Sequence, residues 1–151
     1  MKIIPFSTLM VSTMEATTAQ NTKIQTVQEI YGCFGRGDIP TLMGKLSENA
    51  VFESNGNLPW SGRREGLANI GGFFQAIGSN AQVTVFQPSN FRIEGDRVVN
   101  DCRFGGVAIP TGKTFGYDLV MSWTFDSAGR PLTFNGNALE DQLPQAEAAF
   151  R

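Results

Sequence analysis

The spacing of the apolar residues changes near residue 80, and this change limits the folds that the chain can adopt. Before it, apolar residues recur at helical spacing over 20–35, 38–46 and 67–77. The charged run at 63–65 is expected to open the third of these helices as a solvated segment. After it, apolar and polar residues alternate over 81–139, as in strands. Helices followed by a continuous run of strands predict an α+β fold rather than alternating α/β units.

Turn sequences divide the second half of the chain into strands. Turns at 94–96, 110–113 and 126–129 each contain glycine and separate strand-like runs. The run at 114–125 places large apolar side chains on one face and mostly polar ones on the other. This face is expected to look into an apolar interior, and its members are Tyr117, Leu119, Met121, Trp123 and Phe125.

Residue composition excludes several classes of function. The chain has no histidine, so a Ser-His-Asp triad, a His-ligated zinc site and an imidazole base are impossible. Cys33 and Cys102 lack the CxxC spacing of metal or redox sites and are expected to be buried, so we predict no metal site and no cofactor. With 12 basic and 14 acidic residues and no basic stripe, nucleic acid is not an expected partner.

The chain divides into three parts by pattern. Residues 1–19 are expected to be a disordered extension or a weak leader, 20–141 the folded domain, and 142–151 a C-terminal tail. No apolar run reaches the roughly 20 residues that a bilayer-spanning helix needs, so no membrane partner is expected. The prediction is a cytoplasmic protein, with export as the weaker alternative because Glu15 interrupts the leader pattern.

Three segments resemble a known family when taken in order. They are IYGCFGRGDIPTLMGKLSENAVFE at 30–53, LPWSGRREGLANIGGFF at 58–74 and DLVMSWTFDSAGRPLTF at 118–134. They are similar to the SnoaL-like branch of the nuclear-transport-factor-2-like superfamily, to which ketosteroid isomerase and limonene-epoxide hydrolase also belong. The resemblance implies a cone-shaped, curved antiparallel sheet with three helices packed on its concave face, enclosing a pocket. It also implies a homodimer through the outer sheet face.

The pocket expected from this fold is mostly aromatic. If the Met121 face looks inward, aromatic residues from the helices and strands form the wall, which suits a hydrophobic small molecule. Trp60 is placed at the pocket mouth by the resemblance. The predicted pocket residues are Phe34, Phe52, Ser54, Trp60, Phe74, Asn100, Phe104, Met121, Trp123 and Phe134.

The predicted catalytic residues are Asp141, Tyr117 and Tyr31. The resemblance implies an acidic residue near the end of the last strand, and Asp141 is closest to that position. Burial among aromatic rings would raise the pKa of such a carboxylate toward the range of a general base. Tyr117 or Tyr31 would donate a hydrogen bond to a developing oxyanion. The other candidate, Asp118, is expected on the outer face in a structural pair with Arg103.

Few of the catalytic residues known in the family have counterparts in this sequence. An ungapped comparison with ketosteroid isomerase places Ser54 where that enzyme has its base and Met121 where it has its carboxylic acid. The leading hypothesis is a cofactor-free isomerase, cyclase or hydrolase acting on a hydrophobic substrate, including polycyclic and enolisable ones. Two alternatives are a non-catalytic binding protein for a hydrophobic ligand and a protein-interaction module with a filled core.

Overall fold

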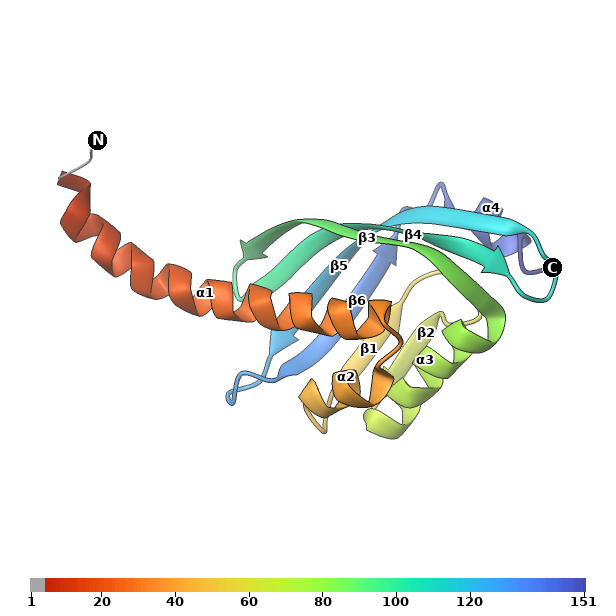
Figure 1. Cartoon of the computed structure of the whole chain (residues 1–151), viewed down its shortest axis with the longest axis horizontal. Helices are drawn as coiled ribbons and strands as arrows, with labels where there is room; N and C mark the ends of the chain where they lie inside the picture. The colour runs from red at the N-terminus through yellow and green to blue at the C-terminus, as the bar shows by residue number, and fades with distance from the viewer. Residues whose placement is uncertain (1–4) are drawn as a thin grey trace.

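One curled sheet of six strands and the helices that cover it make up the described part of the chain (Figure 1). The computed structural model describes the backbone of residues 5–151 and the side chains of 18–151. The elements are α1 (Pro5–Gly35), α2 (Ile39–Lys45), β1 (Val51–Ser54), β2 (Gly62–Glu65), α3 (Leu67–Asn80), β3 (Ala81–Glu94), β4 (Arg97–Ala108), β5 (Thr114–Phe125), β6 (Pro131–Ala138) and α4 (Leu143–Ala148).

The α+β prediction is confirmed, with one difference in the sheet and one in the helices. The strand order is β2-β1-β6-β5-β4-β3, and β1 runs parallel to β6, whereas the other neighbours are antiparallel. The wholly antiparallel sheet was therefore the wrong expectation for this pair. A tight hairpin fixes an antiparallel direction, but β1 and β6 are joined through most of the chain, which leaves either direction open. Within residues 5–151 there are four helices rather than three.

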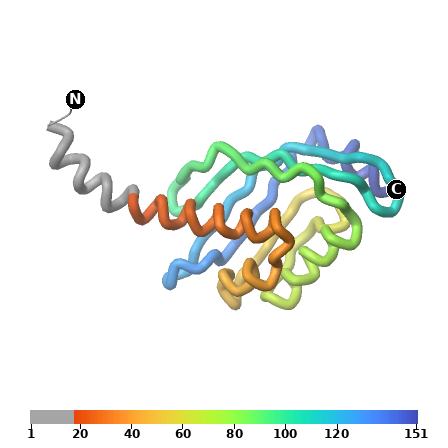
Figure 2. Tube along the Cα trace, viewed as in Figure 1, coloured from red at the N-terminus to blue at the C-terminus, as the bar shows by residue number. Residues whose placement is uncertain are grey.

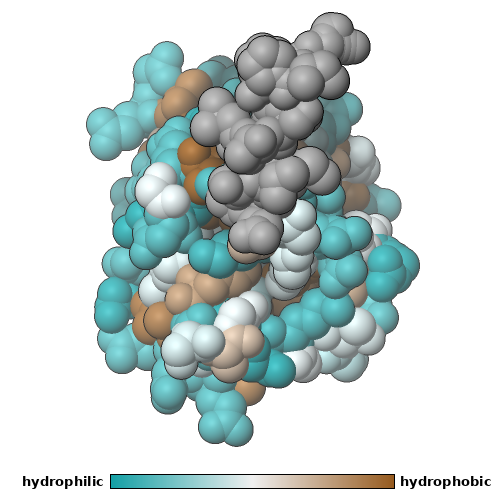
Figure 3. Space-filling model, turned by 90° about the vertical axis from the view of Figure 1, so that its left-hand side faces the viewer, coloured by the Kyte–Doolittle hydropathy of each residue, from teal (hydrophilic) through white to brown (hydrophobic). Residues whose placement is uncertain are grey.

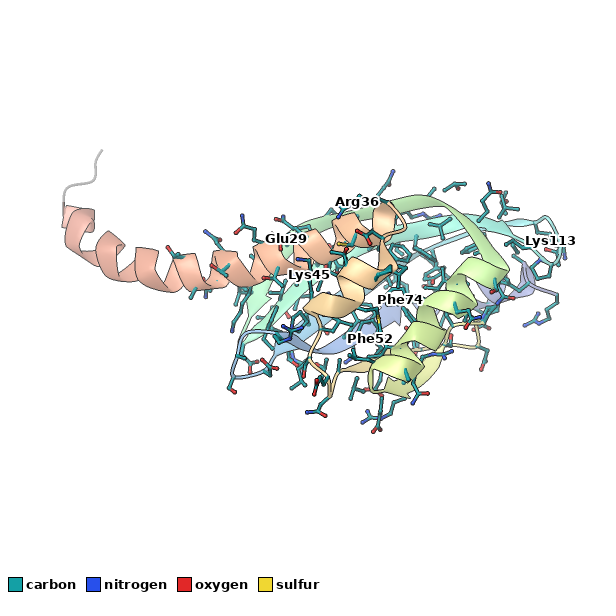
Figure 4. The ribbon with its side chains drawn as sticks, turned by 60° about the horizontal axis from the view of Figure 1, so that its bottom comes forward. Glu29, Arg36, Lys45, Phe52, Phe74 and Lys113 are labelled. Carbon is teal, nitrogen blue, oxygen red and sulfur yellow. The ribbon has the colours of Figure 1, made fainter. Side chains whose placement is uncertain are left out.

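The helices α1, α2 and α3 lie together on one face of the sheet, as the ribbon shows (Figure 1). Asp38 caps α2 by accepting a hydrogen bond from the backbone N–H of Thr41 at 3.3 Å, and Pro40 occupies the first turn. Gly37 has a φ of 72°, which lets the chain reverse between α1 and α2. Glu29 of α1 and Lys45 of α2 form an ion pair of 3.4 Å across this reversal (Figure 4).

The beginning of α1 differs from the predicted start at residue 20. The helix begins at Pro5, and residues 1–4 lie outside the described residues. The expectation that residues 1–19 are a disordered extension or a weak leader stays a prediction. In Figure 2, the part of α1 that is drawn in colour passes in front of the sheet. No described helix is both long and apolar enough to cross a lipid bilayer.

The strands follow the predicted pattern most closely in β4 and β5. The strand β3 is continuous from Ala81 to Glu94, although its pairing with β4 shifts at bulges between Val83 and Val85 and between Ser89 and Arg92. The segment 63–65 does not open a helix but forms β2, paired with β1. The strand β2 has four residues, which are too few for an alternating pattern to be recognised.

The predicted tail at 142–151 forms α4 and packs against the domain. Leu143, Ala146 and Ala149 are buried. The backbone carbonyls of Ala149 and Arg151 accept hydrogen bonds from Thr111 and Lys113, which lie on the hairpin between β4 and β5. The C-terminal segment is therefore a part of the folded domain.

The outer face of the sheet is polar and charged. Arg103 and Asp118 pair across β4 and β5 at 3.5 Å, as predicted, and about half of each side chain is exposed. An ion pair with this exposure contributes little to stability. At the end of the molecule seen in Figure 3, hydrophilic residues predominate and hydrophobic ones form small separate patches. The predicted homodimer through the outer sheet face stays a prediction.

Candidate functional site

A cavity of about 70 Å³ lies between the concave face of the sheet and the three helices. A buried water needs about 10–15 Å³ of such space, so the cavity has room for about five water molecules, or one aromatic ring. Phe52 and Phe74 lie beneath the helices in the interior of the domain (Figure 4). The lining residues are Ile30, Tyr31, Phe34, Leu42, Phe52, Ser54, Asn55, Leu58, Trp60, Phe73, Phe74, Ile77, Phe86, Phe104, Tyr117, Leu119, Met121, Trp123, Phe134, Gly136 and Ala138.

The structure brings most of the predicted site residues together around this cavity. Tyr31 and Tyr117 both line it, with every predicted pocket residue except Asn100. The inward parity of β4 and β5 accounts for this, because Phe104 pairs with Tyr117 and both project toward the helices. The rings form one connected network, in which Phe52 packs on Trp123 at a centroid distance of 5.6 Å.

Asp141 does not lie at the cavity, which corrects its predicted placement. The strand β6 ends at Ala138, and the chain turns there, with the backbone N–H of Gln142 donating to the carbonyl of Leu139 at 2.9 Å. Asp141 is exposed in this turn and does not line the cavity. The Asp141 carboxylate is therefore not placed to act as a base on a molecule in the cavity.

Asn100 lies behind the cavity wall rather than in it, and it anchors Tyr31. Its side chain is 0% exposed, and its Oδ1 accepts a hydrogen bond from the Tyr31 hydroxyl at 2.6 Å. The Tyr31 oxygen in turn accepts from Trp123 Nε1 at 2.9 Å. The Tyr31 hydroxyl therefore has both a donor and an acceptor within the protein and no free proton for a ligand.

Tyr117 forms the second polar group of the wall. Its hydroxyl oxygen accepts a hydrogen bond from Trp60 Nε1 at 3.3 Å, and no described residue accepts its proton. A tyrosine hydroxyl can donate one bond and accept another, so this O–H is available to a molecule in the cavity. The Ser54 hydroxyl, on β1, also forms no hydrogen bond with the described residues.

Trp60 is held in place from outside the cavity by the C-terminal segment. Its indole packs edge-on against Phe150 at 5.5 Å and tilted against Phe115 at 5.9 Å. The loop that carries it is fixed by Glu147, whose Oε2 accepts a hydrogen bond from the backbone N–H of Asn57 at 2.6 Å. Since Trp60 is 3% exposed, these contacts hold the indole, and with it the bond to Tyr117, in one position.

Burial determines the protonation of the acidic groups near the cavity. Desolvation raises the pKa of Tyr31 and of Tyr117 above that of a free tyrosine, although the hydrogen bonds from Trp123 and Trp60 act in the opposite direction. Burial also raises the pKa of the Cys102 thiol to about 12. At neutral pH the two tyrosines are therefore neutral hydrogen-bonding groups and not bases.

The wall contains no carboxylate, ammonium or guanidinium group among the described residues. Likewise, no three His, Cys, Asp or Glu side chains of the described part are placed to hold a metal ion. The site can therefore enclose an apolar molecule and offer it one polarised hydroxyl, but it has no charged side chain that could move a proton.

Comparison with known proteins identifies the family. The SnoaL-like domain matches residues 27–130, which is more than half of the chain. The chain belongs to the SnoaL-like family. A search of curated proteins finds no match.

Solved structures share the fold of this SnoaL-like domain at low sequence identity. An NTF2-like protein of unknown function from Burkholderia pseudomallei superposes with a TM-score of 0.73 at 21% identity, covering 84% of this chain and 98% of its own. A candidate polyketide cyclase from Xanthomonas campestris gives 0.70 at 19% identity, covering 88% and 99%. A candidate isomerase from Bacillus subtilis gives 0.71 at 18% identity, covering 87% and 96%. These likenesses confirm the nuclear-transport-factor-2-like fold.

Sequence reasoning missed part of the SnoaL-like cavity wall. Leu119 shares the parity of Met121 and could have been included on that ground. Phe86 was missed because the bulges of β3 obscure which of its residues face inward. Leu58 precedes Trp60 in an irregular loop, where no periodic signal applies. No pattern in residues 142–151 pointed to Phe150 and Glu147 as supports for Trp60.

Proposed function

We propose that this SnoaL-like domain binds a small hydrophobic molecule in the cavity between its sheet and helices. The observation that carries the proposal is the cavity wall, which is built almost entirely from aromatic and aliphatic side chains. Enclosed apolar cavities with a few polar groups are the usual form of small-molecule sites. The fold likeness to a candidate isomerase and a candidate polyketide cyclase supports a small-molecule role.

The missing carboxylate favours binding over acid–base turnover. Asp141 is exposed away from the cavity, and the position that corresponds to the ketosteroid isomerase base is Ser54. A hydroxyl without a neighbouring base does not take up a proton near neutral pH. The proposal is therefore a binding protein first, and a proton-transferring enzyme that uses Asp141 is no longer part of it.

A second candidate is an enzyme that polarises its substrate without supplying a base. The unclaimed O–H of Tyr117, which accepts from Trp60, favours this reading. Donation from Tyr117 to a carbonyl oxygen would stabilise negative charge that develops there, while a basic group of the substrate itself moves the proton. Such an enzyme would convert the ligand, whereas a binding protein would release it unchanged.

Tryptophan fluorescence tests the binding proposal directly. The chain has 2 tryptophans, Trp60 and Trp123, and both line the cavity, so the whole tryptophan signal reports on this site. Titration with neutral one-ring aromatic compounds should give saturable quenching and a raised melting temperature, because a ligand of the folded form stabilises it. Chromatography of the released compound then separates a binder from an enzyme.

A matched pair of variants assigns the binding to the cavity. Ala138→Leu adds volume to the wall and should weaken binding, whereas Asn137→Leu, one residue earlier on the exposed side of β6, should leave it unchanged. If no compound alters fluorescence or melting temperature, the proposal is wrong and a protein-interaction module with a filled core is the better reading.

A further inference from the structure

The hydrogen-bonding groups of the cavity wall differ in how far the protein itself occupies them. Tyr31 donates to Asn100 and accepts from Trp123, so it has no proton to offer. The side-chain amide of Asn55 is bonded to the backbone of Ala138 at both ends, at 2.8 and 2.9 Å. Among the described residues, this leaves the hydroxyls of Tyr117 and Ser54, together with the second N–H of the Asn55 amide, as side-chain donors for a ligand.

The two remaining hydroxyls are carried by different strands of the sheet, β1 and β5. Ser54 is in register with Gly136, and Gly136 with Met121, so the backbone of Ser54 lies level with Met121, with β6 between them. The backbone of Tyr117 is four residues before Met121 on β5, which is about 13 Å along a strand. The two hydroxyls are therefore separate candidate donors for an acceptor oxygen of a ligand.

Tyr117 is the best placed of these donors. Trp60 donates to the Tyr117 oxygen, and a hydroxyl that accepts a hydrogen bond donates more strongly in return. The position of Trp60 is fixed by Phe115 and Phe150 from outside the cavity. Tyr117 is 3% exposed and its ring packs against Phe104 at a centroid distance of 5.8 Å, so bulk water competes little for its proton.

The absence of charged side chains from the described wall disfavours ionic ligands. No described lining residue carries a charge at neutral pH, so a carboxylate ligand would lose its hydration without gaining a counter-charge. Aromatic faces can attract an organic cation. Such a cation, however, gives the Tyr117 proton no acceptor, whereas a carbonyl or ether oxygen does.

We propose that the ligand is a neutral molecule with one aromatic ring and one hydrogen-bond-accepting oxygen, and that the Trp60–Tyr117 pair recognises this oxygen. This inference rests on the proposed function of the cavity and adds the chemical class of its occupant. A polycyclic compound exceeds the space, which holds about one ring, and would enter only if side chains of the wall moved.

Four compounds of nearly equal size test the ligand class. They are acetophenone, ethylbenzene, benzoate and phenyltrimethylammonium, which differ in the acceptor oxygen and in charge. Fluorescence titration of the wild-type chain should rank acetophenone about fivefold tighter than ethylbenzene, since one hydrogen bond is worth about that factor. Benzoate and the cation should bind at least tenfold more weakly than acetophenone.

Variants and an infrared measurement assign the hydrogen bond to Tyr117. Tyr117→Phe should reduce the preference for acetophenone over ethylbenzene to less than twofold, whereas Thr124→Val, which removes a hydroxyl from β5 outside the cavity wall, should keep it. In the wild-type complex, the carbonyl stretch of acetophenone should move to lower frequency than in hexane. This measurement needs no variant and applies even if Tyr117→Phe does not fold.

The outcomes separate this inference from the proposed function. If ethylbenzene binds as tightly as acetophenone and the carbonyl stretch does not shift, the cavity binds hydrophobic molecules but the ligand class is wrong. If Ser54→Ala and not Tyr117→Phe removes the preference, the assignment to Tyr117 is wrong. Tightest binding of phenyltrimethylammonium would identify an aromatic cage for cations instead, and binding of none of the four would overturn both proposals.

Discussion

Asn100 and Tyr31 form a buried polar contact in a core made mostly of apolar side chains. Replacing Asn100 by leucine would leave the buried Tyr31 hydroxyl without its side-chain acceptor. An unsatisfied buried group of this kind costs about 1–3 kcal/mol. We therefore expect Asn100→Leu to lower the free energy of unfolding by about 1–3 kcal/mol, measured by urea denaturation.

The double variant distinguishes a lost hydrogen bond from a packing defect. With Tyr31→Phe also present, neither partner remains, and the combined loss should be smaller than the sum of the single losses. Asn49→Leu, at an exposed position, is the control and should change stability by less than about 0.5 kcal/mol. Additive losses would contradict the assignment of this bond as the main contribution of Asn100.

Strand parity predicts which face of the sheet a residue occupies, but it does not predict whether the side chain lines the cavity. Parity correctly placed Asn100 and Met121 on the inner side of the sheet. Whether an inward side chain lines the cavity depends on what covers it, and Tyr31 from α1 covers Asn100. For Asp141 the prediction needed a longer last strand, and the turn after Ala138 removed it from the cavity.

Among the glycines, Gly106 leaves the least room for a side chain, because the backbone of β3 lies against β4 there. A Cβ atom built there would lie 2.0 Å from the backbone carbonyl oxygen of Gln82, and a strand backbone has little freedom to move away. We expect Gly106→Ala to destabilise the protein by about 3 kcal/mol, through overpacking, in the same denaturation experiment.

A second glycine provides the matched comparison. Gly78 lies in α3, and a Cβ atom there meets nothing within 4 Å. Alanine is a better helix former than glycine, so Gly78→Ala should raise stability by about 0.5–1 kcal/mol. Equal effects of the two substitutions would show that glycine flexibility, and not close packing, decides the outcome at Gly106.

Element-level predictability depended on length and periodicity. The long strands β4 and β5 and the helix α3 repeat their pattern often enough to be recognised from sequence. The four-residue β2 and the six-residue α4 are too short to show such a repeat. The sequence pattern therefore predicted a helix start at 63–65 and a tail at 142–151 instead. The parallel pairing of β1 with β6 was also beyond prediction, because no short connection links them.

At the scale of the whole molecule, the folded domain holds three acidic groups in protonated form. Burial raises the pKa of Tyr31, Tyr117 and Cys102 in the folded state, the last to about 12. In an unfolded chain, a cysteine has a pKa of about 8.5 and a tyrosine about 10. Below about pH 8 these groups are protonated in both states and do not make stability depend on pH.

Above that pH, the unfolded chain releases protons that the folded chain keeps. Each buried group then lowers the free energy of unfolding by up to about 1.4 kcal/mol per pH unit above its unfolded pKa, until the folded pKa is reached. We therefore expect the urea midpoint to fall steeply between pH 8 and pH 10.5, with Cys102 acting first and the tyrosines only toward the upper end.

Variants separate these groups from the lysines and other exposed residues that titrate in the same range. Cys102→Ala should remove the earlier part of the decline, and Tyr117→Phe should reduce the later part, even if both variants are less stable at pH 8. The comparison is therefore one of slopes, not of absolute stability. If both variants keep the wild-type slope, the buried acids do not cause the alkaline loss. Water would then enter the cavity often enough to let Tyr117 ionise in the folded state. It would also compete with a ligand for the hydrogen bond from the Tyr117 hydroxyl.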